Sequence, residues 1–189
     1  MTWEIKAAAL HGTIELLKRR SLFESVRAEV SPAVRALMDE PPARTAWVAC
    51  LKLAEIDEVL MRNKGRAYLR TFSRDAAMVG AVPAMLTVIQ GMFRLFGATP
   101  NTVFTRVLPL LKGQTHDLEH SYERFDDKSG RLTTRYEGTE TVPEAMLVAF
   151  SGVIAIAFDV CRVTDSGVVG EHVLRVERDH TIVHWDLRW

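Results

Sequence analysis

The chain has 189 residues, of which 48% are hydrophobic, so it can bury an apolar core of its own. Its 24 Lys and Arg residues are matched by 24 Asp and Glu residues. No net positive field therefore favours nucleic acid or an anionic membrane surface. These numbers predict one domain over residues 1–189 that binds no nucleic acid.

The segments that decide localisation point to the cytoplasm. The opening MTWEIKAAAL has a charge inside its apolar stretch and no basic region before it, so we expect no signal peptide. The most apolar run, residues 145–158, is shorter than the roughly 20 residues that span a bilayer. Cys50 and Cys161 form no C-x-x-C motif, and we expect both to be small buried apolar residues. The sequence predicts a cytoplasmic protein with no membrane span.

Residues 1–112 carry apolar side chains mostly at helical spacing. Ser21–Glu24 fits a capping box, and Ser31 precedes a first-turn proline. Gly65 and Gly97 suit helix ends, and Pro109 predicts a kink. Four longer segments are typical of helices: AWVACLKLAEIDEVLMR, AYLRTFSRDAAMV, PAMLTVIQGMFRLFG and NTVFTRVLPLL.

After Gly113 the pattern changes to alternation, which is typical of strands. Residues 116–125 and 131–138 flank DDKSG, which marks a hairpin loop. Pro143 opens a helix to about Phe158, and three strands follow in VCRVTD, EHVLRVER and TIVHWDLRW. This order predicts an α+β fold in which a helical half, 1–112, packs on an antiparallel sheet of order β-β-α-β-β-β in 113–189.

One parity of each strand forms the expected inner face of the sheet. His184, Asp186 and Arg188 have the other parity, so we expect them to face solvent and to pair across strands with Arg175 and Glu177. The inner face is Leu118, His120, Tyr122, Leu132, Thr134, Tyr136, Leu174, Val176, Val183, Trp185 and Leu187.

His116 to His120 matches the inverted zincin pattern H-x-x-E-H. On a helix the two rings would lie about 5–6 Å apart, whereas on a strand the same separation is about 13 Å at ~3.3 Å per residue. We interpret the segment as a strand, so a zinc-dependent hydrolase using His116 and His120 is kept only as an alternative. The sequence also lacks G-x-S-x-G, G-x-G-x-x-G and P-loop motifs. We therefore predict no enzyme, no catalytic residues and no bound metal.

His120, Tyr122 and Tyr136 share the inner face, with Arg124 at its rim. Buried Tyr and His side chains need hydrogen-bond partners. Either they bond one another and nearby backbone, or they line a pocket under the helices of residues 67–111. In the second case, we expect a largely apolar ligand whose anionic or hydrogen-bonding end is held by Arg124.

Three stretches carry a family resemblance: IKAAALHGTIELLKRR, PPARTAW and the closing C-R-V…V-H-W. They resemble an uncharacterised myxobacterial paralogous family. That family is similar in architecture to the bacteriochlorophyll 4-vinyl reductase domain and the haem nitric-oxide/oxygen-binding (H-NOX) domain. The resemblance covers most of the chain and implies helices packed on an antiparallel sheet with a cavity between them.

The resemblance also implies where haem would bind. Haem-binding members carry Y-x-S-x-R on the first strand of the sheet, where it grips the propionates. The matching stretch here, residues 120–124, keeps only Arg124. Those members place an iron-ligating His in the preceding helices, but this sequence has no His between His11 and His116. The axial ligand of that family is therefore missing.

Together these patterns predict a non-enzymatic sensor or adaptor module that binds a small apolar molecule or a partner protein. We expect no cofactor. A haem- or tetrapyrrole-binding sensor is the first alternative, and the zinc-dependent hydrolase is the second. The sequence leaves homo-oligomer formation open.

Overall fold

The computed structural model describes residues 3–80, 86–138, 140–163, 167–168, 173–176 and 179–189. The chain forms two compact units, which are described separately. The helical unit consists of Glu4–Ala84 and Pro143–Val153, and the sheet unit consists of Met1–Trp3, Met85–Val142 and Ile154–Trp189.

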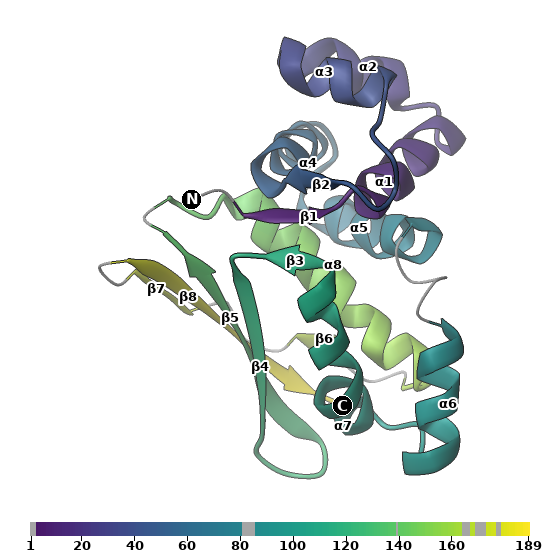
Figure 1. The fold of residues 1–189 in the computed structure, drawn as a ribbon, viewed down its shortest axis with the longest axis vertical. Coiled ribbons are helices and arrows are strands. Elements are labelled where there is room, and N and C mark those ends of the chain that lie inside the picture. The colour runs from purple at the N-terminus through teal and green to yellow at the C-terminus, as the bar shows by residue number, and fades with distance from the viewer. Residues whose placement is uncertain (1–2, 81–85, 139, 164–166, 169–172, 177–178) are drawn as a thin grey trace. The chain divides into compact units, whose positions relative to one another are not determined.

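The helical unit contains five helices, the start of a sixth and two short strands among its described residues (Figure 1). The strands pair antiparallel, with Ile5 opposite Val48. The elements are β1 (Glu4–Lys6), α1 (Ala8–Arg19), α2 (Phe23–Glu29), α3 (Pro32–Asp39), β2 (Trp47–Ala49), α4 (Cys50–Lys64), α5 (Arg66–Gly80) and the first part of α8 (Glu144–Val160).

Two details of the expected helices are wrong. The helix predicted from Ala46 begins only at Cys50, because Trp47–Ala49 forms β2; three residues are too few for alternation to show. The predicted capping box also fails. Ser21 has φ 55° and its N–H donates to Lys18 O, so it closes α1, and α2 follows Leu22 without a side-chain cap. An N-cap needs extended backbone there.

Other helix ends agree with the sequence. Ser31 caps α3 by accepting the Val34 N–H, with Pro32 in the first turn. Glu55 of α4 accepts hydrogen bonds from the Ser31 N–H and hydroxyl. Gly65 ends α4 at φ 88° and Gly97 follows α6 at φ 83°, a region that glycine enters without steric cost. The core of the helical unit includes the fully buried Leu17, Met38, Ile56, Leu60 and Phe72.

The sheet unit begins with helices and ends in strands. A continuous helical segment changes type from π to 3₁₀ at Leu108, next to Pro109, which cannot donate a backbone hydrogen bond. The elements are α6 (Leu86–Phe96), α7 (Pro100–Thr102), a π-helix (Val103–Val107), a 3₁₀ helix (Leu108–Gly113), β3 (Thr115–His116), β4 (Leu118–Arg124), β5 (Ser129–Glu137), the end of α8, β6 (Gly167–Val168), β7 (Val173–Val176) and β8 (His180–Arg188).

The five-stranded antiparallel sheet has the order β4-β5-β8-β6, and β7 also pairs with β8 (Figure 1). The predicted α+β fold is confirmed, while the observed order of elements after Gly113 is β3-β4-β5-α8-β6-β7-β8 and includes the short β3, which was not predicted. The strand expected in VCRVTD is wrong, because α8 continues to Val160 and the backbone then turns through Arg162 at φ 56°. Residues 164–166 of that segment lie outside the described residues.

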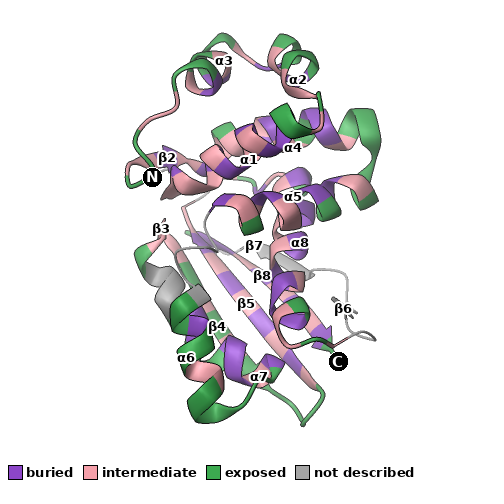
Figure 2. Ribbon diagram, turned by 90° about the vertical axis from the view of Figure 1, so that its right-hand side faces the viewer, coloured by how far each residue is buried: buried purple, intermediate pink, exposed green. Residues whose placement is uncertain are grey.

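Burial of the sheet follows the predicted parity (Figure 2). On β4 the inward residues are half-buried, while Glu119, Ser121 and Glu123 are exposed. The side chains of Leu174, Val176 and Arg175, and the whole of Glu177, lie outside the described residues. The buried inward residues of β5 and β8 are Leu132, Thr134, Tyr136, Thr181, Val183, Trp185 and Leu187.

No described helix is both long enough and apolar enough to cross a membrane.

Candidate functional site

His120 lies on β4 opposite Thr134 of β5. Its Nδ1 is 2.9 Å from Thr134 Oγ1, and Thr134 is fully buried. Burial lowers the pKa of His120 to about 4, because desolvation disfavours the imidazolium form. The ring is therefore neutral at physiological pH and offers hydrogen bonding without charge.

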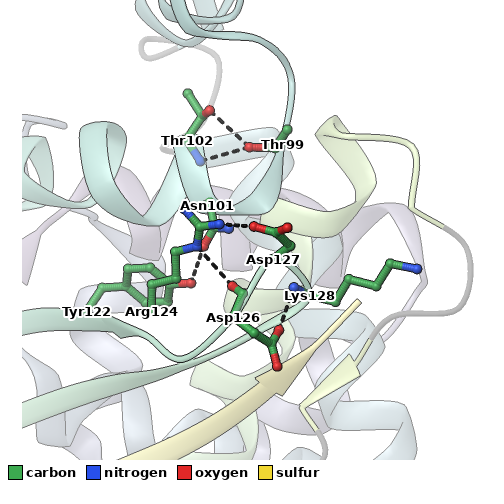
Figure 3. Close-up of polar contacts among 8 residues, drawn as sticks. All are labelled: Thr99, Asn101, Thr102, Tyr122, Arg124, Asp126, Asp127 and Lys128. Atoms are coloured by element: carbon green, nitrogen blue, oxygen red, sulfur yellow. Dashed lines mark hydrogen bonds and ion pairs between the residues drawn. The ribbon is translucent and has the colours of Figure 1, made fainter.

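Tyr122 is fixed by two residues that the sequence analysis did not identify. Its ring stacks on Phe104 at a centroid distance of 5.2 Å, and its hydroxyl donates to Asn101 Oδ1 at 2.5 Å (Figure 3). Desolvation raises the pKa of Tyr122 to about 12, so the hydroxyl keeps its proton. Gly130 leaves room for the ring, because a Cβ there would lie 2.4 Å from the Tyr122 hydroxyl oxygen.

Arg124 is exposed and held by the β4–β5 hairpin loop (Figure 3). Its Nε donates to Asp126 O at 2.9 Å, and its guanidinium forms an ion pair with Asp127. The Arg124 guanidinium is therefore already paired with the Asp127 carboxylate. An anionic ligand would have to compete with Asp127 for the same donors.

Tyr136 lies on β5 two residues beyond Thr134 and is 2% exposed. Its ring meets Trp3 edge-to-face at 5.1 Å, and the Trp3 indole N–H donates to Glu137 O at 2.6 Å. Strand pairing places Tyr136 beside Leu118 and His120 beside Thr134. The structure thus brings His120, Tyr122 and Tyr136 to one face of the sheet.

The zinc motif does not form its required geometry. His116 lies on β3 and His120 on β4, separated by Asp117 at φ 56°. Among the residues with described placement, no three His, Cys, Asp or Glu side chains could together hold a metal ion. An inverted zincin needs its two His residues on one helix, and the strands do not provide this.

The cysteines are unsuited to nucleophilic or metal chemistry. Cys50 is buried, as expected, but Cys161 is only half-buried. Desolvation raises the thiol pKa of Cys50 to about 12 and that of Cys161 to about 11. Both residues remain thiols at neutral pH, whereas the thiolate is the reactive form.

The outward residues of β8 pair mainly with β5. His184 is half-buried, not solvent-facing as predicted, and its Nδ1 lies 2.9 Å from Thr133 Oγ1. Asp186 accepts two hydrogen bonds from Arg131, at 2.7 and 3.2 Å, and Arg131 holds the Asp186 pKa below its usual value. The sequence predicts cross-strand pairing with Arg175 and Glu177, whereas the described partners of His184 and Asp186 are residues of β5.

Comparison with known proteins identifies the architecture. No protein-family model matches the sequence, and no curated protein matches it. Solved H-NOX structures do match over nearly the whole chain. A variant of Tt H-NOX has a TM-score of 0.64 at 12% identity, covering 98% of this chain and 95% of that one.

Two further structures agree. An oxygen-binding H-NOX domain related to soluble guanylate cyclases, solved as its oxygen complex, has a TM-score of 0.61 at 11% identity and covers 97% and 94% of the two chains. The Fe(II) unliganded H-NOX protein from K. algicida has a TM-score of 0.58 at 11% identity and covers 97% and 96%. The chain therefore has an H-NOX-like architecture.

The family resemblance implies a haem site, so the side chains of this chain are compared with one. No His occurs in the helical segments 86–113 and 154–160 of the sheet unit. His120 is the one inward-facing His on β4, β5 and β8, and Arg124 is paired with Asp127. The residues present do not fit the haem site that the family resemblance implies.

Proposed function

We propose that the chain is a non-enzymatic sensor module of H-NOX-like architecture, and that His120, Tyr122 and Tyr136 form its ligand-binding face. The observation that carries this is the chemistry of His120, a desolvated neutral imidazole held by Thr134. The His120 imidazole and the protonated Tyr122 hydroxyl give this face of the sheet hydrogen-bonding groups that carry no charge. Such a face suits a small, largely apolar and uncharged ligand.

This proposal revises the expected role of Arg124. An anionic end on the ligand would need a guanidinium partner to compensate for the hydration that it loses on burial. Arg124 already pairs with Asp127 on the exposed hairpin. We therefore assign ligand contact to the uncharged residues of the face and give Arg124 the role of supporting the hairpin.

Haem binding is the second candidate function, favoured by the H-NOX neighbours. A neutral imidazole whose Nδ1 is fixed by a neighbouring oxygen resembles the orientation of metal-bound His residues. His120 is the residue that would have to take this role, since the helices of the sheet unit supply no His. We assign no step to haem.

A matched pair of variants tests the binding face. Nile red, an uncharged apolar dye, would be titrated into the wild-type protein and followed by fluorescence. Thr134→Val removes the inner partner of His120, and Thr133→Val removes the outer partner of His184. We expect saturable binding that weakens about tenfold, or ~1.4 kcal/mol, in Thr134→Val only. Equal affinities in both variants, or no saturable binding to the wild type, would contradict the proposal.

A further inference from the structure

Helix α6 carries apolar side chains over a wide arc, only part of which is buried. Ile89 is buried and Phe93 half-buried, so these two anchor the helix to the protein. Val88, Leu95 and Phe96 of the same helix are 44%, 77% and 55% exposed, and α6 is largely exposed in Figure 2. Thr87, Gln90 and Arg94 form the polar side of the helix, and an apolar side is normally covered by another part of a protein.

The exposed apolar residues form a regular stripe together with Gly91 and the half-buried Met92. Val88, Gly91, Met92, Leu95 and Phe96 stand at positions i, i+3, i+4, i+7 and i+8, which is the spacing by which one helix packs on another. A Cβ on Gly91 would meet nothing within 4 Å, so a partner's side chain has room at the middle of the stripe. We call these five residues the α6 stripe.

The charged residues of the chain segment that carries the stripe have one sign. Residues 76–116 include no Asp or Glu, and their charged residues are Arg94, Arg106 and Lys112. Arg94 and Arg106 are exposed, and the Arg106 guanidinium lies 5.0 Å from the centroid of the Phe96 ring. Arginine beside an aromatic ring is typical of the residues that dominate protein–protein binding.

We propose that the α6 stripe is the docking surface for an acidic amphipathic helix of a partner protein. The partner's apolar residues pack on Leu95 and Phe96, and its carboxylates meet Arg94 and Arg106. Charge complementarity selects an acidic partner and disfavours a basic one. This surface contains none of the residues of the proposed ligand face, so it does not depend on a ligand binding there.

Two synthetic helical peptides test this surface. Both carry Leu at heptad a and d positions; one has Glu and the other Lys at the remaining charged positions. Binding to the full chain is measured by fluorescence anisotropy. We expect the Glu peptide to bind at least about tenfold more tightly than the Lys peptide. The double variant Arg94→Glu/Arg106→Glu should reverse this preference.

Phe125 provides a matched control. Its ring is 51% exposed, and Arg131 lies 5.4 Å from its centroid, which closely resembles Phe96 with Arg106. We expect Leu95→Ser/Phe96→Ser to weaken Glu-peptide binding about tenfold or more, a loss typical of a central contact, while Phe125→Ser leaves it unchanged. Circular dichroism confirms that each variant is folded.

Three results would overturn the proposal. The first is equal binding of the two peptides to the wild-type protein. The second is a dimer, seen by sedimentation, that Leu95→Ser/Phe96→Ser dissociates, because the stripe would then be occupied by a second copy. The third is binding to phosphatidylglycerol vesicles that the same substitutions abolish while peptide binding is unaffected, because the stripe would then be a membrane contact.

Discussion

Gly12 of α1 and Gly80 of α5 touch where the two helices cross. A Cβ added to Gly12 would lie 2.3 Å from Ala76 O and 2.8 Å from Gly80 Cα, and a Cβ added to Gly80 would lie 2.4 Å from Ala8 O. These are backbone atoms, which cannot move aside as the end of a side chain can. The close crossing therefore depends on the absence of side chains at both positions.

We expect Gly12→Ala to destabilise the protein by about 1–3 kcal/mol, the usual cost of overpacking. Gly91→Ala is the control, because a Cβ on Gly91 of α6 meets nothing within 4 Å. Alanine favours helix over glycine by about 0.8–1.0 kcal/mol, so this variant should be slightly stabilised. Urea denaturation of both variants measures the difference, and a neutral Gly12→Ala would show that α1 and α5 do not cross this closely.

Trp185 and its neighbour His184 test the burial parity of the sheet. Trp185 is 0% exposed, so Trp185→Ala should cost about 3–5 kcal/mol as a truncation in a packed core. His184 contributes one hydrogen bond to Thr133, so His184→Ala should cost about 0.5–1.5 kcal/mol. Denaturant melts that show the opposite order would contradict the observed register.

The lowered pKa of His120 makes stability depend on pH. The folded-state pKa is about 4, below the model-peptide value of about 6.5, so between these values the unfolded chain binds more protons. Stability therefore falls as pH decreases through this window, by at most about 1.4 kcal/mol per pH unit for one proton. We expect His120→Gln to show a shallower decline than the wild-type protein from pH 6.5 to 4. Parallel curves would mean that His120 titrates normally.

Within the sheet unit, Trp3 contacts β5 through its indole N–H and its ring. Trp3→Phe keeps an aromatic ring beside Tyr136 but leaves Glu137 O without this donor. We expect a loss of about 1 kcal/mol, within the usual range of 0.5–1.5 kcal/mol for a hydrogen bond. Trp3→Ala should lose more, about 3–5 kcal/mol, because it also empties a fully buried site. Thermal melts in which Trp3→Phe and Trp3→Ala have the same melting temperature would contradict this difference in stability.

The sequence predicted those features that depend on local periodicity. Alternation over 181–189 was sufficient to place Trp185 inside, because one-sided burial admits a single register. Contacts between distant segments were not predictable in this way. Asn101 and Phe104 fix Tyr122 from a helical segment, and Trp3 reaches Glu137 across 134 positions. No spacing rule encodes such pairs.

The predicted surroundings of Arg124 and His184 were wrong for the same reason, because both depend on contacts that strand parity does not determine. Arg124 has inward parity, which predicts a place at the rim of a pocket, but its side chain donates to the Asp126 carbonyl and forms an ion pair with Asp127. Parity places His184 on the outer face of the sheet and therefore predicts exposure to solvent. Parity does not show how far neighbouring side chains cover a residue, and Thr133 of β5 contacts His184 here.

The most direct test of the central claim is a hemin titration followed by absorbance. We propose that this H-NOX-like chain binds an uncharged apolar ligand, and it lacks a helix-borne iron ligand because no His lies between His11 and His116. We predict that reduced protein with one equivalent of hemin shows no saturable Soret band, and that His120→Ala gives the same spectrum. A 1:1 complex with a sharp Soret band in the wild-type protein, lost in His120→Ala, would contradict it and establish haem binding through His120.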